Sequence, residues 1–167
     1  GAIGEPFWIH HQLLSGFDWF NSTGWHHKLP RFQIHQYGMH NFDILAVWLG
    51  RQPTSIFAQA TRRPNQVYKG DMMTAVSCRY HDQLQAMLQE TNALHPARPW
   101  ATHFEIHGTK GCIVSSNIDR ISIYNDQTGA DGQHHTFGIS WFPDAFAYPM
   151  YELMTAILDG LEPAHAA

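Results

Sequence analysis

The stretch QYGMHNFDILAVWLG, residues 36–50, has the pattern of an amphipathic helix. Its apolar residues recur at the three- and four-residue spacing of one helix face. They are Met39, Phe42, Leu45, Ala46 and Leu49. Gly50 follows the last of them and Pro53 lies shortly beyond, which is a normal signal for the end of a helix. The pattern therefore predicts a helix over residues 36–49, with Gln36, His40 and Asp43 sharing a second, polar face.

The segments around this helix alternate or carry aromatic and β-branched residues, as strands do. The predicted strands are residues 5–14, 55–61, 74–80, 84–88, 103–107, 112–116, 121–124 and 136–141. A second helix is expected near the C-terminus, with an apolar stripe of Phe146, Met150, Leu153, Met154, Ile157 and Leu158. Pro149 suits its first turn, and Gly160 ends it.

Strands in series with a helix near each end indicate an α+β fold. We expect an open, largely antiparallel β-sheet with the helices packed on one face and the other face available for dimerisation. The chain has 167 residues and no internal repeat or linker, so we expect a single domain over residues 1–167.

Composition narrows the class of protein. Charged residues make up only 14% of the chain and aromatic residues 13%, so we expect a partner to cover apolar surface in a homodimer or higher oligomer. The net charge of −4 and the ten scattered Lys and Arg residues argue against nucleic-acid binding. No apolar run approaches the roughly 20 residues that span a bilayer. We see no signal peptide and expect a cytoplasmic protein with two free thiols, Cys78 and Cys112.

Residues 36–50 resemble a hallmark segment of the Gfo/Idh/MocA oxidoreductases, in which an Asp, a Gly, a His and a second Asp precede a run ending in Leu-Gly. The matching residues are Gln36, Gly38, His40, Asp43, Leu49 and Gly50. Residues 3–6, 104–111 and 151–163 resemble, in order, the entry segment, the central hairpin and the last helix of the family's C-terminal domain. The resemblance implies the substrate-side domain of a sugar or polyol oxidoreductase without its N-terminal Rossmann domain.

The family's Rossmann domain holds NAD or NADP through a Gly-rich turn between a strand and a helix. The turn at residues 108–111 lies between strands instead, and the family's Glu-Lys-Pro motif is absent. We therefore expect the parent protein to use NAD or NADP and this chain alone to bind neither.

The resemblance assigns the catalytic base to His40. Oxidation of an alcohol needs a base for the hydroxyl proton, and histidine suits that role. The family position one turn earlier is usually Asp but is Gln36 here. A carboxylate would polarise the imidazole, whereas an amide can only orient the ring or hydrogen-bond a substrate hydroxyl. Gln36 in place of Asp therefore implies either altered catalytic chemistry or a weaker dehydrogenase activity. Asp43 is expected to be structural.

The irregular segment at residues 15–31 carries Trp25, His26 and His27, which we interpret as candidate sugar-binding residues because aromatic rings stack on sugars. His35, just before the helix, is expected to line the same cleft. The alternative is an interface Trp and surface histidines.

Thirteen histidines raise a second hypothesis, a free-standing sugar- or metal-binding protein on the same scaffold. Neighbouring histidines on a strand point to opposite faces, so the pair His10-His11 cannot chelate one ion. A His-Glu-x-x-His helix is absent, although three histidines from different elements would still suit Zn²⁺ or Ni²⁺. A third interpretation is a purely structural dimerisation domain.

Overall fold

The computed structural model describes residues 1–16, 25–95, 98–117, 119–138 and 143–162. In this part of the chain, eight strands form one sheet in the order β2-β3-β4-β1-β5-β6-β7-β8. The strands are β1 Pro6–Leu14, β2 Ser55–Thr61, β3 Met73–Arg79, β4 Gln85–Thr91, β5 Ala101–Gly108, β6 Gly111–Ser116, β7 Arg120–Asn125 and β8 Gln133–Thr136. Only β1 and β4 run parallel among these neighbours. The predicted α+β class with an open, largely antiparallel sheet is confirmed.

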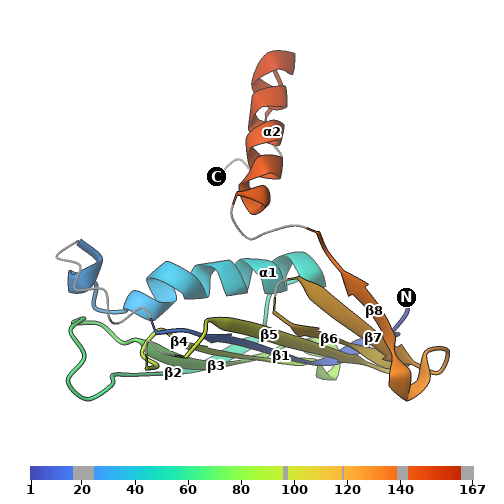
Figure 1. Cartoon of the computed structure of the whole chain (residues 1–167), viewed down its shortest axis with the longest axis horizontal. Helices are drawn as coiled ribbons and strands as arrows, with labels where there is room; N and C mark the ends of the chain where they lie inside the picture. The colour runs from blue at the N-terminus through green and yellow to red at the C-terminus, as the bar shows by residue number, and fades with distance from the viewer. Residues whose placement is uncertain (17–24, 96–97, 118, 139–142, 163–167) are drawn as a thin grey trace.

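Helix α1, Met39–Leu49, lies across one face of the sheet (Figure 1). It continues a π-helical turn, Ile34–Gly38, so the predicted helix is confirmed but its first residues are π-helical. Gly50 ends it in the left-handed conformation with φ 60°, and its N–H donates to the carbonyl of Ala46 at 2.8 Å. Glycine adopts this conformation without the steric cost of a Cβ.

The main core lies between α1 and the sheet. Its buried residues are Ile9, Leu45, Val76, Cys78, Tyr80, Leu84, Ala86 and Leu88. Leu45, Phe42 and Leu49 of the predicted stripe face this core, but Met39 is 58% exposed. Asn41 is buried instead. A hydropathy pattern cannot identify such an inward polar residue, because the sheet beneath it provides a partner that the pattern does not contain.

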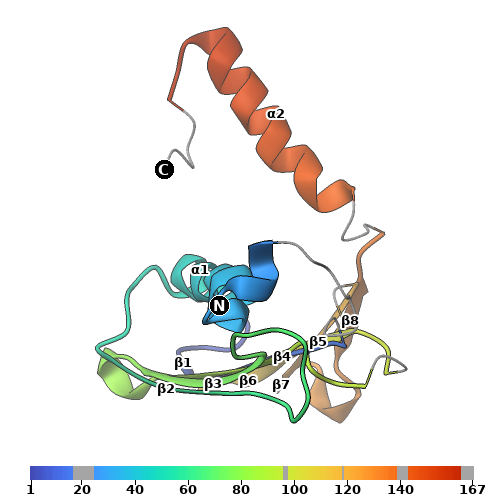
Figure 2. The ribbon, with the colours of Figure 1, turned by 90° about the vertical axis from the view of Figure 1, so that its left-hand side faces the viewer.

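Helix α2, Asp144–Asp159, stands on the same side as α1 but projects away from the sheet (Figures 1 and 2). Its large apolar residues are exposed, including Leu158 at 83%. The helix begins at Asp144, so Pro149 lies inside it and not in its first turn as predicted. No helix among the described residues combines the length and the apolar character needed to cross a membrane.

The last strand differs from its prediction. β8 spans Gln133–Thr136, whereas the strand was expected at residues 136–141. His134 pairs with Ser122 of β7 in the sheet. The sheet edge is therefore formed by the polar residues before the predicted apolar run, because pairing with β7 sets the strand's position. Residues 139–142 lie outside the described part of the chain.

Candidate functional site

A buried carboxylate lies beneath the π-helical turn and the start of α1. Glu90 of β4 is only 4% exposed. Gln33 donates from Nε2 to its Oε2 at 3.3 Å, and Asn41 donates from Nδ2 to its Oε1. Each carboxylate oxygen thus accepts one amide hydrogen bond, which lowers the free energy cost of burying the charge.

This network continues toward the end of β1. Asn92 donates from Nδ2 to Oε1 of Gln33 at 2.8 Å, and the hydroxyl of Ser15 donates to Oδ1 of Asn92. Ser15, Gln33 and Asn92 are all buried. The network ties the turn before α1 to strands β1 and β4 and holds it in one place.

Burial raises the pKa of Glu90, while the hydrogen bonds from Asn41 and Gln33 and the charge of His40 act to lower it. The net direction is upward. Desolvation disfavours the charged form of a carboxyl group, and opposite charges and donors favour it.

The three predicted residues His35, Gln36 and His40 are exposed on the outer side of the same segment. His35 and Gln36 belong to the π-helical turn and His40 to the first turn of α1. The structure therefore brings this part of the predicted site together. Asp43 is exposed further along α1.

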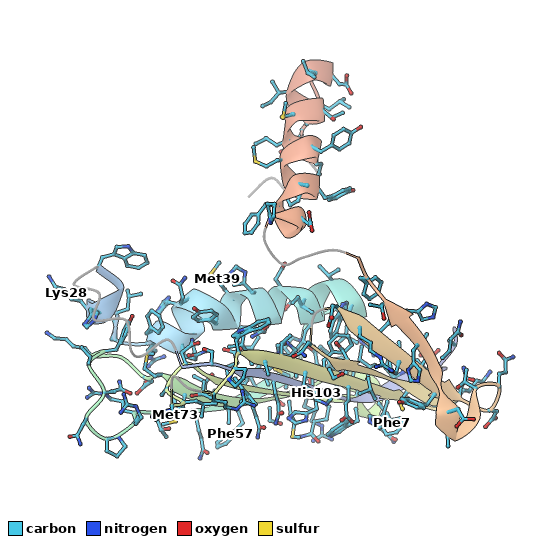
Figure 3. The ribbon with its side chains drawn as sticks, viewed as in Figure 1. Phe7, Lys28, Met39, Phe57, Met73 and His103 are labelled. Carbon is cyan, nitrogen blue, oxygen red and sulfur yellow. The ribbon has the colours of Figure 1, made fainter. Side chains whose placement is uncertain are left out.

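Three of the predicted sugar-binding residues, Trp25, His26 and His27, lie in a 3₁₀ turn, Trp25–Lys28, beyond the N-terminal end of α1 (Figures 1 and 3). Trp25 is 69% exposed. The His27 ring stacks on Tyr68 with centroids 4.4 Å apart, and Lys69 donates its N–H to the His27 carbonyl at 3.1 Å. The side chain of His26 lies outside the described part of the structure.

A second buried cluster supports these turns from inside. It consists of Phe32, Tyr68, Met72 and Ala93, with Leu29, Tyr37 and Met73 packed against it. Tyr37 of the π-helical turn and Tyr68 of the loop between β2 and β3 both contact Phe32. The 3₁₀ turn, through the stacking of His27 on Tyr68, and the π-helical turn, through Tyr37, thus rest on the same buried cluster.

Glu90, Asn41 and Gln33 were not predicted from the sequence. The signal for Glu90 was available, because it continues the two-residue period of Ala86 and Leu88, both buried. A carboxylate in phase with buried residues needs donors, but the sequence does not show which residues supply them.

The opposite face of the sheet carries the histidines of β5. His103 and His107 each place Nε2 2.9 Å from a different oxygen of Glu105, and the bonds from His107 and then His103 lower the pKa of Glu105. The side chains of the adjacent pair His10-His11 point to opposite faces as expected, because His11 is buried in register with Phe104 while His10 lies opposite Glu105 in the sheet. In the described ranges, no three His, Cys, Asp or Glu side chains are grouped so that they could hold a metal ion.

An apolar hollow of about 370 Å³ lies at the other end of α1. Its lining consists of Ile3, Pro6, Ile9, Trp48, Leu49, Phe104, Ile106, Ile113 and Ile121. A sugar needs hydrogen-bonding groups to fix its orientation, and these side chains offer almost none. The polar end of α1 is the better candidate site.

The Gly-rich turn of this chain does not fit a dinucleotide. The Gly-rich turn at Gly108–Gly111 joins β5 to β6 in a hairpin, so no helix N-terminus faces it to bind a pyrophosphate. Residues 1–114 match the model of the GFO/IDH/MocA C-terminal domain. The chain belongs to the Gfo/Idh/MocA family. The resemblance stated from the motifs is confirmed.

Relatives in the Gfo/Idh/MocA family include sugar dehydrogenases. The chain is 31% identical over 134 residues to D-apiose dehydrogenase of Rhizobium rhizogenes, covering 79% of this chain and 37% of that protein. An oxidoreductase from Agrobacterium radiobacter, solved in complex with NAD⁺, L-tartaric acid and magnesium, matches with a TM-score of 0.75 at 25% identity over 98% of this chain and 50% of its own.

Levoglucosan dehydrogenase in complex with NADH shares the fold, with a TM-score of 0.80 at 18% identity over 99% of this chain and 53% of its own. The chain therefore spans about half the length of these family members or less. It matches the C-terminal domain of the family.

Proposed function

We propose that this chain is the substrate-binding and oligomerisation half of an NAD(P)-dependent oxidoreductase that oxidises a secondary alcohol of a sugar or polyol to a ketone. The main support is the position of His40, exposed on a turn whose buried side is fixed by the Glu90 network. Catalytic groups need such rigid support to keep their geometry. The relative named D-apiose dehydrogenase supports a sugar as substrate class.

In this function, His40 accepts the proton of the substrate hydroxyl as the alcohol is oxidised. Gln36, one turn earlier on the same exposed side, hydrogen-bonds a neighbouring hydroxyl through its amide, which can both donate and accept. NAD or NADP would supply the hydride acceptor and would be held by the part of the parent enzyme that this chain does not contain.

Trp25, His26, His27 and His35 are proposed to bind the sugar. The exposed indole of Trp25 offers an apolar face for the C–H side of a sugar ring, and His35 lies on the same segment as Gln36 and His40. His27 is held by its stacking on Tyr68, which fixes the turn that carries Trp25.

We further propose that two copies pair through the sheet face opposite α1. Alternation along β2 and β3 places Phe57 and Met73 on that face, and Figure 3 shows both beneath the sheet.

The exposed apolar side of α2 would pack against the cofactor-binding half of the parent enzyme, because an apolar helix surface of this kind is usually covered by a partner.

The alternative is a free-standing sugar-binding protein on the same scaffold. The observation in its favour is Gln36, a neutral residue where an acidic partner for His40 would strengthen its basicity. A metal-dependent version has no support from the described side chains, which form no ligand cluster.

The test joins this chain to the cofactor-binding half of the Rhizobium rhizogenes relative, giving a reconstituted enzyme. NADH and NADPH formation is measured with D-apiose, levoglucosan and a panel of polyols. We expect turnover of at least one of them, and His40→Asn should lower kcat by about 10²- to 10⁴-fold. A folded fusion that binds sugar without turnover would support the alternative, and full activity of the His40→Asn variant would exclude His40 as the base.

A further inference from the structure

Glu90 has a position that packing alone does not explain. Its carboxylate is held from two sides of one short segment, by Gln33 just before the π-helical turn and by Asn41 in the first turn of α1. Between these two donors lie His35, Gln36 and His40, which all face outward. A single buried group therefore anchors both ends of the segment that presents the candidate site.

A buried charge at this place is costly. Its cross-strand neighbours, Leu13 on β1 and Thr74 on β3, carry no charge that could pair with it. An apolar residue of similar size would often be as stable or more stable in such a position. With Glu90 at this position, the folded protein is less stable than it would be with such an apolar residue. A functional role for the charge of Glu90 would explain its presence.

The carboxylate of Glu90 lies close to the backbone of the π-helical turn above it. A Cβ placed on Gly38 would be 3.7 Å from Oε2 of Glu90, so the carboxylate lies at van der Waals range of the π-helical turn. His40 lies two residues after Gly38, on the outer side of the same segment. Gln36, its polar neighbour one turn earlier, carries no charge.

We propose that Glu90 is a positioning residue for His40, which fixes the turn that presents the imidazole and supplies a negative charge beneath it. The proposal rests on the proposed function, in which His40 is the base. The charge of Glu90 stabilises the protonated imidazole that forms when His40 takes up the substrate proton, a state for which neutral Gln36 provides no counter-charge.

Burial is the largest effect on the pKa of Glu90 and raises it, while the charge of His40 acts in the opposite direction. Of the other histidines near the strand, His11 lies diagonally across β1 with its pKa lowered to about 4 by burial, so it is neutral at physiological pH. Interaction between two titrating groups is reciprocal, so a change at either one is measurable at the other.

The first experiment follows the side-chain carboxyl resonance of Glu90 by NMR across a pH series in the chain itself. His40→Asn is expected to raise the pKa of Glu90, because it removes the positive charge that lowers it. His35→Asn, a matched exposed histidine on the same segment, is expected to leave it unchanged. Both replacements are at exposed positions, so they leave the fold intact. Equal values in all three proteins would overturn the coupling.

The second experiment measures the dependence of kcat/KM on pH in the reconstituted enzyme. Glu90→Gln is expected to shift the acidic limb to lower pH, because the substitution removes a negative charge from beneath the candidate site. Glu90→Asp keeps the charge and is expected to keep the limb while kcat falls. Glu105→Gln, on the opposite sheet face, is the control and should change neither.

A fall in kcat for Glu90→Gln with an unmoved limb would show a purely structural role and overturn the proposal. Full activity of His40→Asn would overturn the proposed function instead and, with it, the catalytic meaning of Glu90. The NMR comparison separates these failures, because it reports the coupling between the two side chains without any turnover.

Discussion

Asn41, on the inner side of α1, donates its amide to Oε1 of Glu90 on β4. This hydrogen bond joins the helix to the sheet at a point where both side chains are buried. Removal of one partner of a buried hydrogen bond leaves the other unsatisfied, which costs more than the bond itself contributes.

Asn41→Leu should therefore destabilise the protein even though leucine is apolar and similar in size. The expected loss of unfolding free energy is about 1–3 kcal/mol, because a Glu90 oxygen is left without a donor. Urea unfolding measures it, with Val47→Ala as the control on the exposed side of the same helix. An equal effect of the two substitutions would mean that the Asn41 bond contributes nothing.

The pH dependence of stability should depend on His11. It is buried, its Nδ1 has no hydrogen-bond partner among the described residues, and burial, with smaller effects of His10 and His103, lowers its pKa to about 4. The folded pKa is below the unfolded value of 6.5, so the folded state prefers neutral His11. Its contribution is present above pH 6.5 and is lost as the pH falls through about 4.

The size of this loss is on the order of 3 kcal/mol, from about 2.5 pH units at 1.36 kcal/mol each. Chemical unfolding at a series of pH values from 7 to about 4 should show a shallower decline for His11→Gln than for the wild type. His10→Gln, on the other side of the same strand, should decline almost as the wild type does. Parallel curves for His11→Gln and wild type would refute the assignment.

The elements themselves could be predicted because their patterns are local. The alternating pattern predicted β2 with the same bounds as in the structure. Gly50 was predicted to end the helix, and it ends α1 in the left-handed conformation. The pairing of Asn41 with Glu90 could not be predicted, since it depends on which strand passes under which turn of the helix. The exposure of the apolar stripe of α2 could not be predicted either. The stripe predicts that this side of the helix is buried, but it does not predict which partner buries it.

The loop between β2 and β3 should depend on Gly70. A Cβ at this position would overlap the carbonyl oxygen of Leu29 and approach the amide of Phe32 at 2.9 Å, both of them backbone atoms. Gly70→Ala is expected to cost about 1–3 kcal/mol and to disturb the turn that carries Trp25. Gly138→Ala, where no atom lies within 4 Å of the new Cβ, is the control. Thermal unfolding compares the two, and an equally small shift in both would contradict the close contact.

The proposed pairing of two copies through the open sheet face can be separated from association through α2. Met87 lies on β4 between the inward residues Ala86 and Leu88, so it points to the open face. Light scattering should show a dimer for the wild type and a monomer for Met87→Arg, since an unpaired charge is costly in an interface. Leu158→Arg on α2 should remain dimeric. The reverse pattern would assign the contact to α2.

Trp25 should bind substrate without taking part in the chemistry. Its exposed ring would contact the sugar equally in the ground state and the transition state, and such uniform binding affects KM but not kcat. In the reconstituted enzyme, Trp25→Ala is expected to raise KM by roughly 5- to 20-fold, the loss of about 1–2 kcal/mol of stacking. Phe57→Ala, equally exposed on the opposite face of the sheet, should leave KM unchanged. A fall in kcat with constant KM for Trp25→Ala would instead place the indole at the reacting carbon, where its loss would displace the alcohol from His40.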